Sequence, residues 1–445
     1  MNFFKDKYNI LCIVIYLAML LCFYIPGVSR EDGVLVYMAV FSVCFILYWV
    51  MYVRNKDREV GVREVLYAAI VLRLLLIATE PVTSDDYYRY LWDGKVQNAG
   101  LNPFLYSPLE LTEHHDDVVY PKVTFPEIKT IYPPVSQIIF LTAYFISPDS
   151  SAGLKFVYLI FDIGVMMFLF LSLKEFNMRS GLMILYAFSP LILLEIFLNA
   201  HIDVILIFFL SGCVYFTIKK NQALSLLMLG FSVLSKTYSL IFLPVVLLYF
   251  IRNEKSVNRS LKNIKNFLFF LFPFLIIYFY RHGILNVFSV MENYMKHWYS
   301  NNLIYKMILY LSELSGFTDH SVTRKILLVL FVISYCILLI MNIDLIKKFT
   351  LVTIFYFLFS HTVHPWYLCI LVMLLPLYFS YASFVWTGII CLTNFTVYYY
   401  LKSGVWEDVS YILFTEYILV LVFLSIDIKK LKNINYKVSE RIISV

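Results

Sequence analysis

The sequence predicts an all-α, polytopic membrane protein, and two properties of its composition support this. Of its 445 residues, 61% are hydrophobic and only 15% are charged, whereas soluble domains carry about 25% charged residues. Aromatic residues make up 18% of the chain, and many lie near the ends of apolar runs, where Trp and Tyr anchor membrane helices. The net charge is +6, and the Lys and Arg residues lie mainly in short loops. In such loops they set the orientation of a membrane protein, so no nucleic-acid partner is expected.

The apolar runs predict 12 or 13 membrane-spanning helices in one domain over residues 1–445. A spanning helix needs about 20 apolar residues, and the candidate runs are 10–28, 34–53, 64–80, 155–173, 182–199, 203–218, 222–251, 266–281, 326–344, 349–360, 366–380, 382–401 and 411–428. The run 222–251 is too long for one span, so two short helices turning at Ser235–Thr237 are expected. A shorter run, 133–147, would be either a further span or a juxtamembrane or re-entrant helix.

The basic residues orient these helices. Lys and Arg between 54 and 63 predict a cytoplasmic loop, which places the loop 81–131 on the opposite side. That loop has eight acidic and four basic residues and so lacks a Lys/Arg excess. We therefore expect a multi-pass protein of the plasma (inner) membrane. Its external first loop, 81–131, and a second external loop, 282–325, would face the outside or periplasm, with both termini cytoplasmic.

The most unusual stretch is Thr83–Gly94, which is charged and aromatic and directly follows an apolar run. In a helix, Asp86, Arg89, Tyr90 and Asp93 would share one face. Asp85 would point about 100° away from Asp86. One aspartate could then be a general base on an acceptor hydroxyl, while the other orients Arg89 or binds a sugar. The alternative is a solvated helix capped by Ser84, with acids in its first turn.

A second polar cluster comprises Asn199, His201 and Asp203, with Glu195 one turn earlier. If the segment were helical, Glu195, Asn199 and Asp203 would lie on one face. Ionisable groups at membrane depth are functional hypotheses by default, and the alternative is a structural hydrogen-bond network between helices.

Several cations follow predicted helix ends. Lys236 interrupts an apolar run and needs an anion, either a carboxylate or a phosphate. Further cations are Arg281, His282, His361 and His364, the last of which precedes Pro365–Trp366–Tyr367. Around an outward-facing cavity such cations would suit a phosphate leaving group. The alternative is that they are snorkelling interfacial residues.

No metal or other cofactor is expected. The segment His114–Asp117 has the residue types of a metal site, but clustered polar residues in loops are more often simply solvated. His201 lacks a second histidine at ligand spacing. The seven cysteines lie in apolar runs without CxxC spacing, so neither a zinc site nor a disulfide framework is indicated.

These stretches together resemble GT-C fold glycosyltransferases. The motifs are Ser84–Gly94, Gly100–Phe104 and Ile131–Pro134, followed by Asn199–Val204, Lys236 before Leu243–Pro244, and Pro365–Tyr367. The first three are similar to the first external loop of bacterial polyprenol-phosphate-mannose-dependent α-mannosyltransferases, and the others occur in the expected order. Two positions depart from the family pattern: Ala200 stands where glycine is usual, and Thr237 where a proline commonly follows the lysine.

The resemblance implies inverting transfer of a hexose, most simply mannose, from a polyprenyl-phosphate donor. The acceptor would be a lipid-linked or cell-envelope glycan at the outer membrane face, and membrane lipid surrounds the protein. Asp86 or Asp85 would be the catalytic base, and Lys236 and His364 would lie near the donor phosphate. The residues expected to bind substrate are Arg89, Tyr90, Asp93, Asn199, His201, Asp203, Lys236, His364 and Trp366.

Two other functions fit a polytopic membrane protein. A flippase or transporter for lipid-linked glycans would carry ionisable residues deep in several helices, together with internal repeats. Here the charges gather at helix ends, and no repeat is evident. A polysaccharide ligase would use a similar acceptor, but it would leave the paired aspartates without an obvious role.

Overall fold

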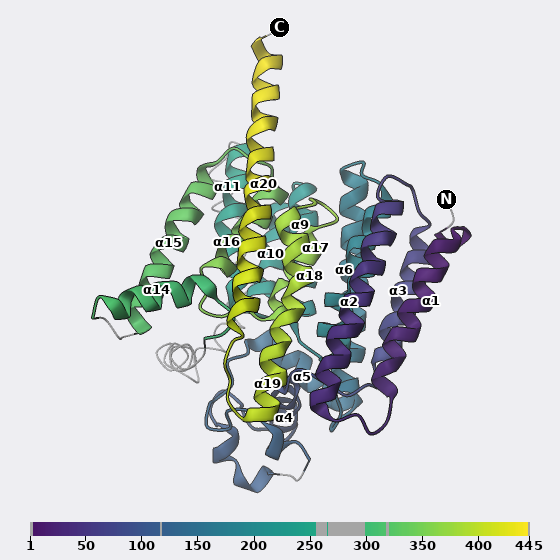
Figure 1. The fold of residues 1–445 in the computed structure, drawn as a ribbon, viewed down its shortest axis with the longest axis vertical. Coiled ribbons are helices and arrows are strands. Elements are labelled where there is room, and N and C mark those ends of the chain that lie inside the picture. Colours follow the sequence, from purple (N-terminus) through teal and green to yellow (C-terminus); the bar gives the residue numbers. More distant parts are fainter. Residues whose placement is uncertain (1–2, 116–117, 255–264, 266–298, 317–319, 444–445) are drawn as a thin grey trace. The chain divides into compact units, whose positions relative to one another are not determined.

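The computed structural model describes residues 3–115, 118–254, 265, 299–316 and 320–443 (Figure 1). The regular elements among these residues are helices, and the strand pairing among them is an isolated parallel bridge between Ser300 and Thr362. The all-α prediction is confirmed. The chain divides into two compact units, Met1–Trp298 and Tyr299–Val445. The helix expected at 266–281 and the candidate residues Asp116, Asp117, Arg281 and His282 lie outside the described residues.

The polytopic prediction is also confirmed. Among the described residues, seven helical segments are long and apolar enough to cross a membrane: Lys7–Tyr24, Arg30–Asn55, Ser151–Glu175, Ser180–Leu198, His320–Ile340, Tyr381–Ser403 and Ser410–Leu431. Shorter apolar helical segments cover Pro134–Ile146, Asp203–Ile218, Gln222–Val233, Thr237–Asn253 and Pro365–Leu374. The break at Lys236 separates two of these, as expected.

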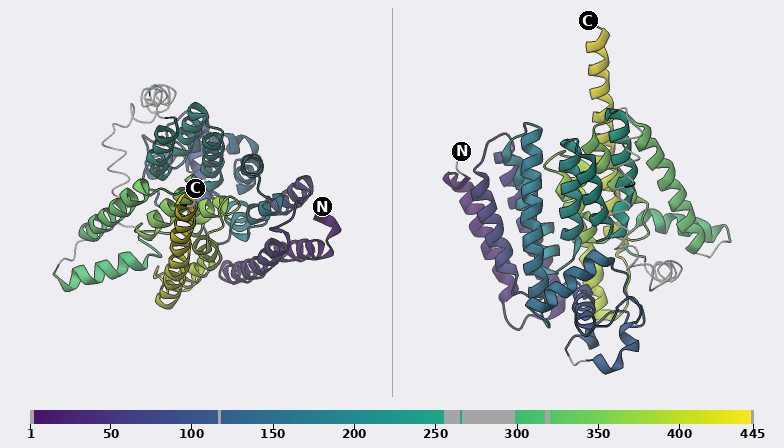
Figure 2. Two further views of the ribbon diagram at one scale, coloured as in Figure 1. Left: turned by 90° about the horizontal axis from the view of Figure 1, so that it is seen from above. Right: turned by 180° about the vertical axis from the view of Figure 1, so that it is seen from behind.

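The first unit is a row of packed helices. They are α1 (Lys7–Leu21), α2 (Arg30–Asn55), α3 (Val62–Leu76), α6 (Ser151–Glu175), α9 (Asp203–Ile218), α10 (Gln222–Val233) and α11 (Phe242–Glu254). Helix α3 packs on α1 and α6, and α9 packs between α6 and α10 (Figure 2). Helix α3 ends at Leu76, four residues before the predicted boundary of 80. The non-helical residues 77–80 then lead into the first loop.

A buried ion pair fixes α3 against α6. Arg73 Nε lies 2.5 Å from Asp162 Oδ2, and both side chains are fully buried. Arg73 also donates to the carbonyl oxygen of Ala187, and Tyr186 donates to the other oxygen of Asp162. Near the end of α3, Lys155 Nζ donates to the Leu76 carbonyl oxygen over 3.2 Å. These bonds satisfy buried charges that would otherwise be costly.

The first loop contains one short helix, and a second short helix follows it. Helix α4 (Asp86–Asn98) packs on α5 (Pro134–Ile146), and three 3₁₀ turns, Pro108–Glu110, Thr112–His114 and Tyr120–Lys122, lie between them. A Cβ added at Gly94 would stand 2.6 Å from the Phe140 carbonyl oxygen, so glycine permits this close approach. With 13 residues, α5 is about 20 Å long, shorter than the roughly 30 Å hydrocarbon core.

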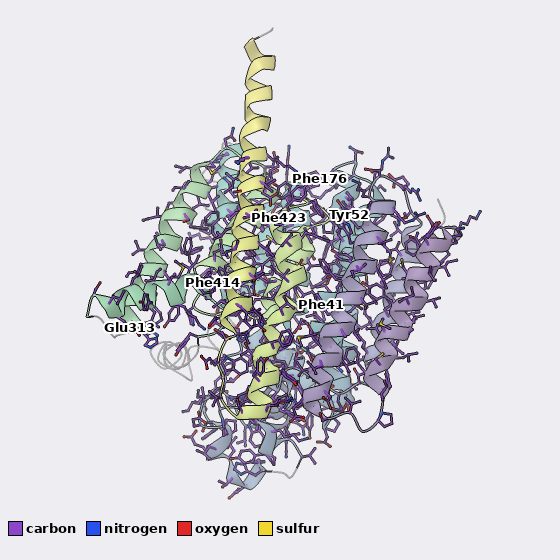
Figure 3. The ribbon with its side chains drawn as sticks, in the orientation of Figure 1. Phe41, Tyr52, Phe176, Glu313, Phe414 and Phe423 are labelled. Carbon is purple, nitrogen blue, oxygen red and sulfur yellow. The ribbon has the colours of Figure 1, made fainter. Side chains whose placement is uncertain are left out.

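The second unit contains α14 (Leu303–Leu314), α15 (His320–Ile340), α16 (Leu345–Leu358), α17 (Cys369–Leu374), α18 (Tyr381–Ile389), α19 (Asn394–Ser403) and α20 (Ser410–Ile443). Helix α18 packs on α20. One face of α20 exposes apolar side chains at Tyr411, Phe414, Ile418 and Val422, and Phe414 is labelled in Figure 3. Their spacing of three to four residues is that of one helix face, which suits contact with lipid.

Candidate active site

The segment after α3 ends at the paired aspartates. Asp85 occupies the N-cap position of α4, and Asp86 is the first helical residue. The expected cap, Ser84, lies one position earlier, although its hydroxyl oxygen accepts a hydrogen bond from the Asp86 amide over 3.2 Å. The two carboxylates therefore point in different directions and contact different residues.

Asp85 faces α2. Arg30 Nη2 lies 2.9 Å from Asp85 Oδ1, and Arg30 Nε donates to the Val82 carbonyl oxygen. Arg89, which one of the two aspartates was expected to orient, instead pairs with Asp93, and its Nε lies 2.9 Å from Asp93 Oδ1. Asp85 thus fixes the loop to α2.

Asp86 faces the second polar cluster. Its Oδ2 lies 3.8 Å from His201 Nδ1, and 36% of its side chain is exposed. Surrounding protein raises the pKa of Asp86 to about 6, mainly by desolvation; Lys236 opposes the rise, while Asp85 and Asp203 add to it. A carboxylate that is accessible to solvent and has a pKa near neutrality can take up a proton under physiological conditions.

The cluster at 195–203 is not a continuous helix, so its predicted single face is wrong. Leu193–Leu198 forms a π-helical turn, and Ala200 follows with φ of +60°. A left-handed alanine is uncommon because its Cβ crowds the backbone. This conformation gives a physical reason for glycine at the matching position of the family pattern. Single π-turns occur frequently at functional sites.

Asn199 fastens the first loop to this turn. Its Oδ1 accepts hydrogen bonds from the amides of Val82 and Thr83, each 3.1 Å long, and its Nδ2 donates to Thr83 Oγ1 over 2.7 Å. The side chain is completely buried. The structure therefore places Asn199 against the backbone that leads to Asp86.

Lys236 and Asp203 form an ion pair beside the cluster. Lys236 Nζ lies 2.7 Å from Asp203 Oδ2, with 13% of the lysine side chain exposed. Tyr238 donates to Asp203 Oδ1 over 3.4 Å. Of the two anions considered for Lys236, the structure shows the carboxylate.

Arg89, Tyr90 and Asp93 are brought together on α4 and are buried. Asp93 Oδ2 accepts from Thr130 Oγ1 at 2.6 Å and from Gln137 Nε2 at 2.8 Å. Tyr90 stacks on Phe140, with ring centroids 4.7 Å apart. These contacts hold α4 against α5 and thereby fix the direction of its first turn.

His364 and Trp366 belong to the second unit. Their rings stack, with centroids 4.4 Å apart. The preceding residue, Val363, donates its amide to the Ser300 carbonyl oxygen, and its own carbonyl oxygen accepts from Asn301 Nδ2. Asn301 and Trp386 both donate to Glu416 Oε1, over 3.2 and 2.7 Å. A buried carboxylate thus anchors the segment that carries His364.

Several residues that contact the site were not predicted. They are Arg30, Thr130, Gln137, Tyr238, and Tyr37, whose hydroxyl donates to Glu195. Gln137 could have been found, because it is a lone amide inside the apolar run 133–147. The tyrosines had no such signal in a chain with 36 of them. Among the described residues, no group of three or more His, Cys, Asp or Glu side chains is arranged to hold a metal ion.

The fold defines a polytopic membrane protein in which a cluster of ionisable side chains lies at the start of a short helix. Residues 24–252 match the MptA_B family, described as alpha-(1->6)-mannopyranosyltransferase, N-terminal domain. Because this match covers more than half of the chain, the protein belongs to that family, and it is a glycosyltransferase. The resemblance to mannosyltransferases is confirmed. No curated protein matches the sequence.

Proposed function

We propose that the protein transfers a mannosyl residue, with inversion, from a polyprenyl-phosphate-linked donor to a hydroxyl of a lipid-linked or cell-envelope glycan. The observation that carries this proposal is the position of Asp86, a partly exposed carboxylate among buried polar groups. The family description supplies the α-(1→6) linkage. Inversion would produce that linkage from a β-linked donor.

Asp86 is the proposed base. Its raised pKa gives it affinity for the proton of an acceptor hydroxyl, while Lys236 keeps the carboxylate form accessible near neutrality. As the acceptor oxygen bonds to the anomeric carbon, its proton passes to Asp86. The bond from that carbon to the phosphate oxygen breaks, and its electron pair leaves with the phosphate.

Lys236 is the proposed partner of that phosphate. Its charge acts on Asp86 and its side chain retains some exposure, so a phosphate could share it with Asp203. A positioned cation stabilises charge that develops on a leaving group. We therefore propose a reaction that needs no metal ion.

The proposed location is the outer face of the plasma membrane. The basic loop between 54 and 63 precedes α3, and the first loop follows it, so the positive-inside rule supports an external Asp86. A lipid-linked donor would reach this face without a nucleotide-binding domain.

Reconstitution tests the proposal. The purified full-length protein is supplied with polyprenyl-phosphate β-mannose and a mannoside acceptor, and the product linkage is determined. We expect an α-mannoside with the lipid donor and none with a nucleotide-linked mannose. Asp86→Asn should lower kcat about 10²- to 10⁴-fold, the usual contribution of general base catalysis.

The matched control is Asp85→Asn, which removes the neighbouring carboxylate. Transfer from the nucleotide sugar alone, or a retained β-linkage, would refute the proposed donor and stereochemistry. Equal activity of Asp86→Asn and the unsubstituted protein would refute the proposed base. Addition of EDTA should leave the rate unchanged.

A further inference from the structure

His201 lies between two carboxylates. Its Nδ1 is 3.8 Å from Asp86 Oδ2, and its Nε2 is 3.4 Å from Glu195 Oε2. The other oxygen of Glu195 accepts a hydrogen bond from the hydroxyl of Tyr37. The two ring nitrogens therefore face different acids, one at the proposed reaction site and one in the interior.

This line of groups is open to solvent at one end. The side chains of His201, Glu195 and Tyr37 are completely buried, whereas Asp86 is 36% exposed. A proton that moves inward from Asp86 would therefore be shielded from water, and it could return to water only through Asp86.

The backbone sets this alignment. The His201 amide donates to the Glu195 carbonyl oxygen over 3.0 Å, across the π-turn and the left-handed Ala200. This tight loop turns His201 back beside Glu195, although the two are six positions apart. The left-handed conformation of Ala200 therefore determines where His201 lies. Backbone strain of this kind persists where the surrounding structure requires it.

We propose that His201 is a proton-relay residue that holds the acceptor's proton after Asp86 has removed it. This inference rests on the proposed function of Asp86. The proton moves from Asp86 Oδ2 to His201 Nδ1, which restores the Asp86 carboxylate and forms an imidazolium. Its Nε2–H then faces the Glu195 carboxylate, and the proton returns to water through Asp86 after the products leave.

The gap between Asp86 Oδ2 and His201 Nδ1 must close for the proton to pass. The separation of 3.8 Å is longer than a hydrogen bond, but such contacts commonly shorten only when substrate binds. The other charged groups acting on Asp86 are Asp85, Asp203 and Lys236. The imidazolium would form between the carboxyl groups of Asp86 and Glu195, while Asp203 is paired with Lys236 and Asp85 with Arg30.

A kinetic experiment tests the relay. In His201→Gln and Glu195→Gln we expect kcat to fall at least 10-fold while the KM for the lipid donor stays within twofold. Because Asp86 is exposed and alanine leaves room for the ring, added imidazole should restore part of the lost rate of His201→Ala. A merely structural role would raise KM or leave the variant insensitive to imidazole, and either result would overturn the proposal. His114→Gln, in the first loop, is the control and should behave as the unsubstituted protein.

A second measurement needs no substrate and so separates this inference from the proposed function. Histidine labelled with ¹⁵N reports which ring nitrogen of His201 carries the proton. For Nδ1 to accept a proton from Asp86, the neutral ring must carry its own proton on Nε2, which faces Glu195. In Glu195→Gln we expect this preference for the Nε2–H tautomer to weaken. A neutral ring with its proton on Nδ1 would overturn the proposal even if transfer from the lipid donor is observed.

Discussion

Arg30 Nη2 lies 2.9 Å from Asp85 Oδ1, so the first of the two neighbouring aspartates pairs with α2. Asp86 faces His201 instead. The pair looks redundant in the sequence, but the structure gives its members separate partners.

The Arg30–Asp85 pair should contribute little to stability and rate. Both side chains are more than a third exposed, and exposed pairs contribute about 0–1 kcal/mol. Asp85→Asn should therefore keep kcat within about fivefold, in contrast to Asp86→Asn. Turnover measurements on Asp85→Asn and Arg30→Gln check this. A collapse of activity in Asp85→Asn with normal activity in Asp86→Asn would reverse the assignment.

The rate should depend on pH through Asp86. The base acts as a carboxylate, and its pKa is raised to about 6. The protonated form therefore prevails below pH 6, and kcat/KM should fall there, approaching tenfold for each further pH unit. A profile of kcat/KM from pH 4.5 to 8 measures this. A rate that is constant down to pH 4.5 would contradict it.

The same pKa predicts the stability of Asp86→Asn. Because the folded protein raises the pKa of this acid, the carboxylate form is disfavoured by folding at pH values above the unfolded pKa. Removing the charge should leave the protein equally or more resistant to thermal unfolding at pH 7.5. Loss of activity with retained stability would exclude misfolding as its cause.

Lys236 should have separable effects on folding and donor binding. Lys236→Met leaves the buried Asp203 carboxylate without the lysine of its ion pair, which should cost about 3–5 kcal/mol. In Lys236→Met/Asp203→Asn both charges are absent, so much of the stability should return. The KM for the lipid donor should nevertheless remain raised, because the cation for its phosphate is gone. A normal donor KM in this double variant would exclude Lys236 as the phosphate partner.

Ala200→Gly should stabilise the protein. Ala200 has φ of +60°, and relief of this left-handed strain is expected to yield about 1 kcal/mol. Ala68→Gly is the control, and it should lower the free energy of unfolding. Ala68 lies inside α3, and glycine in a helix interior costs about 1 kcal/mol. Thermal or denaturant unfolding of both variants tests the pair.

Asn199 should act through position rather than through substrate contact. Asn199→Ala removes three hydrogen bonds to Val82 and Thr83, so Asp86 would be held less accurately. Misplacement of about 1 Å can cost 10²-fold in rate, and we expect a loss of this order in kcat. A selective rise in KM, with kcat intact, would instead indicate direct binding of substrate.

Composition and apolar run length were sufficient to predict the helical membrane architecture and the break at Lys236. They could not locate helix ends to within a turn, as the early end of α3 shows. The motif order identified Asp85 and Asp86, but only geometry separates them, because Arg30 approaches from 55 positions away in sequence. Glu195, Asn199 and Asp203 do not share one helix face as predicted, because no periodic pattern in the sequence indicates a π-turn or a left-handed alanine.

The π-helical turn Leu193–Leu198 makes this part of the chain sensitive to length as well as to sequence. Such a turn contains one residue more than an α-helical turn would need. Deleting one residue there would leave an ordinary α-helical turn and remove the widening that positions the segment Asn199–Asp203. Asn199 would then lose the backbone of Val82, and His201 would turn away from Asp86. Single-residue deletions in this turn should therefore be far less tolerated than deletions in the first loop's 3₁₀ turns.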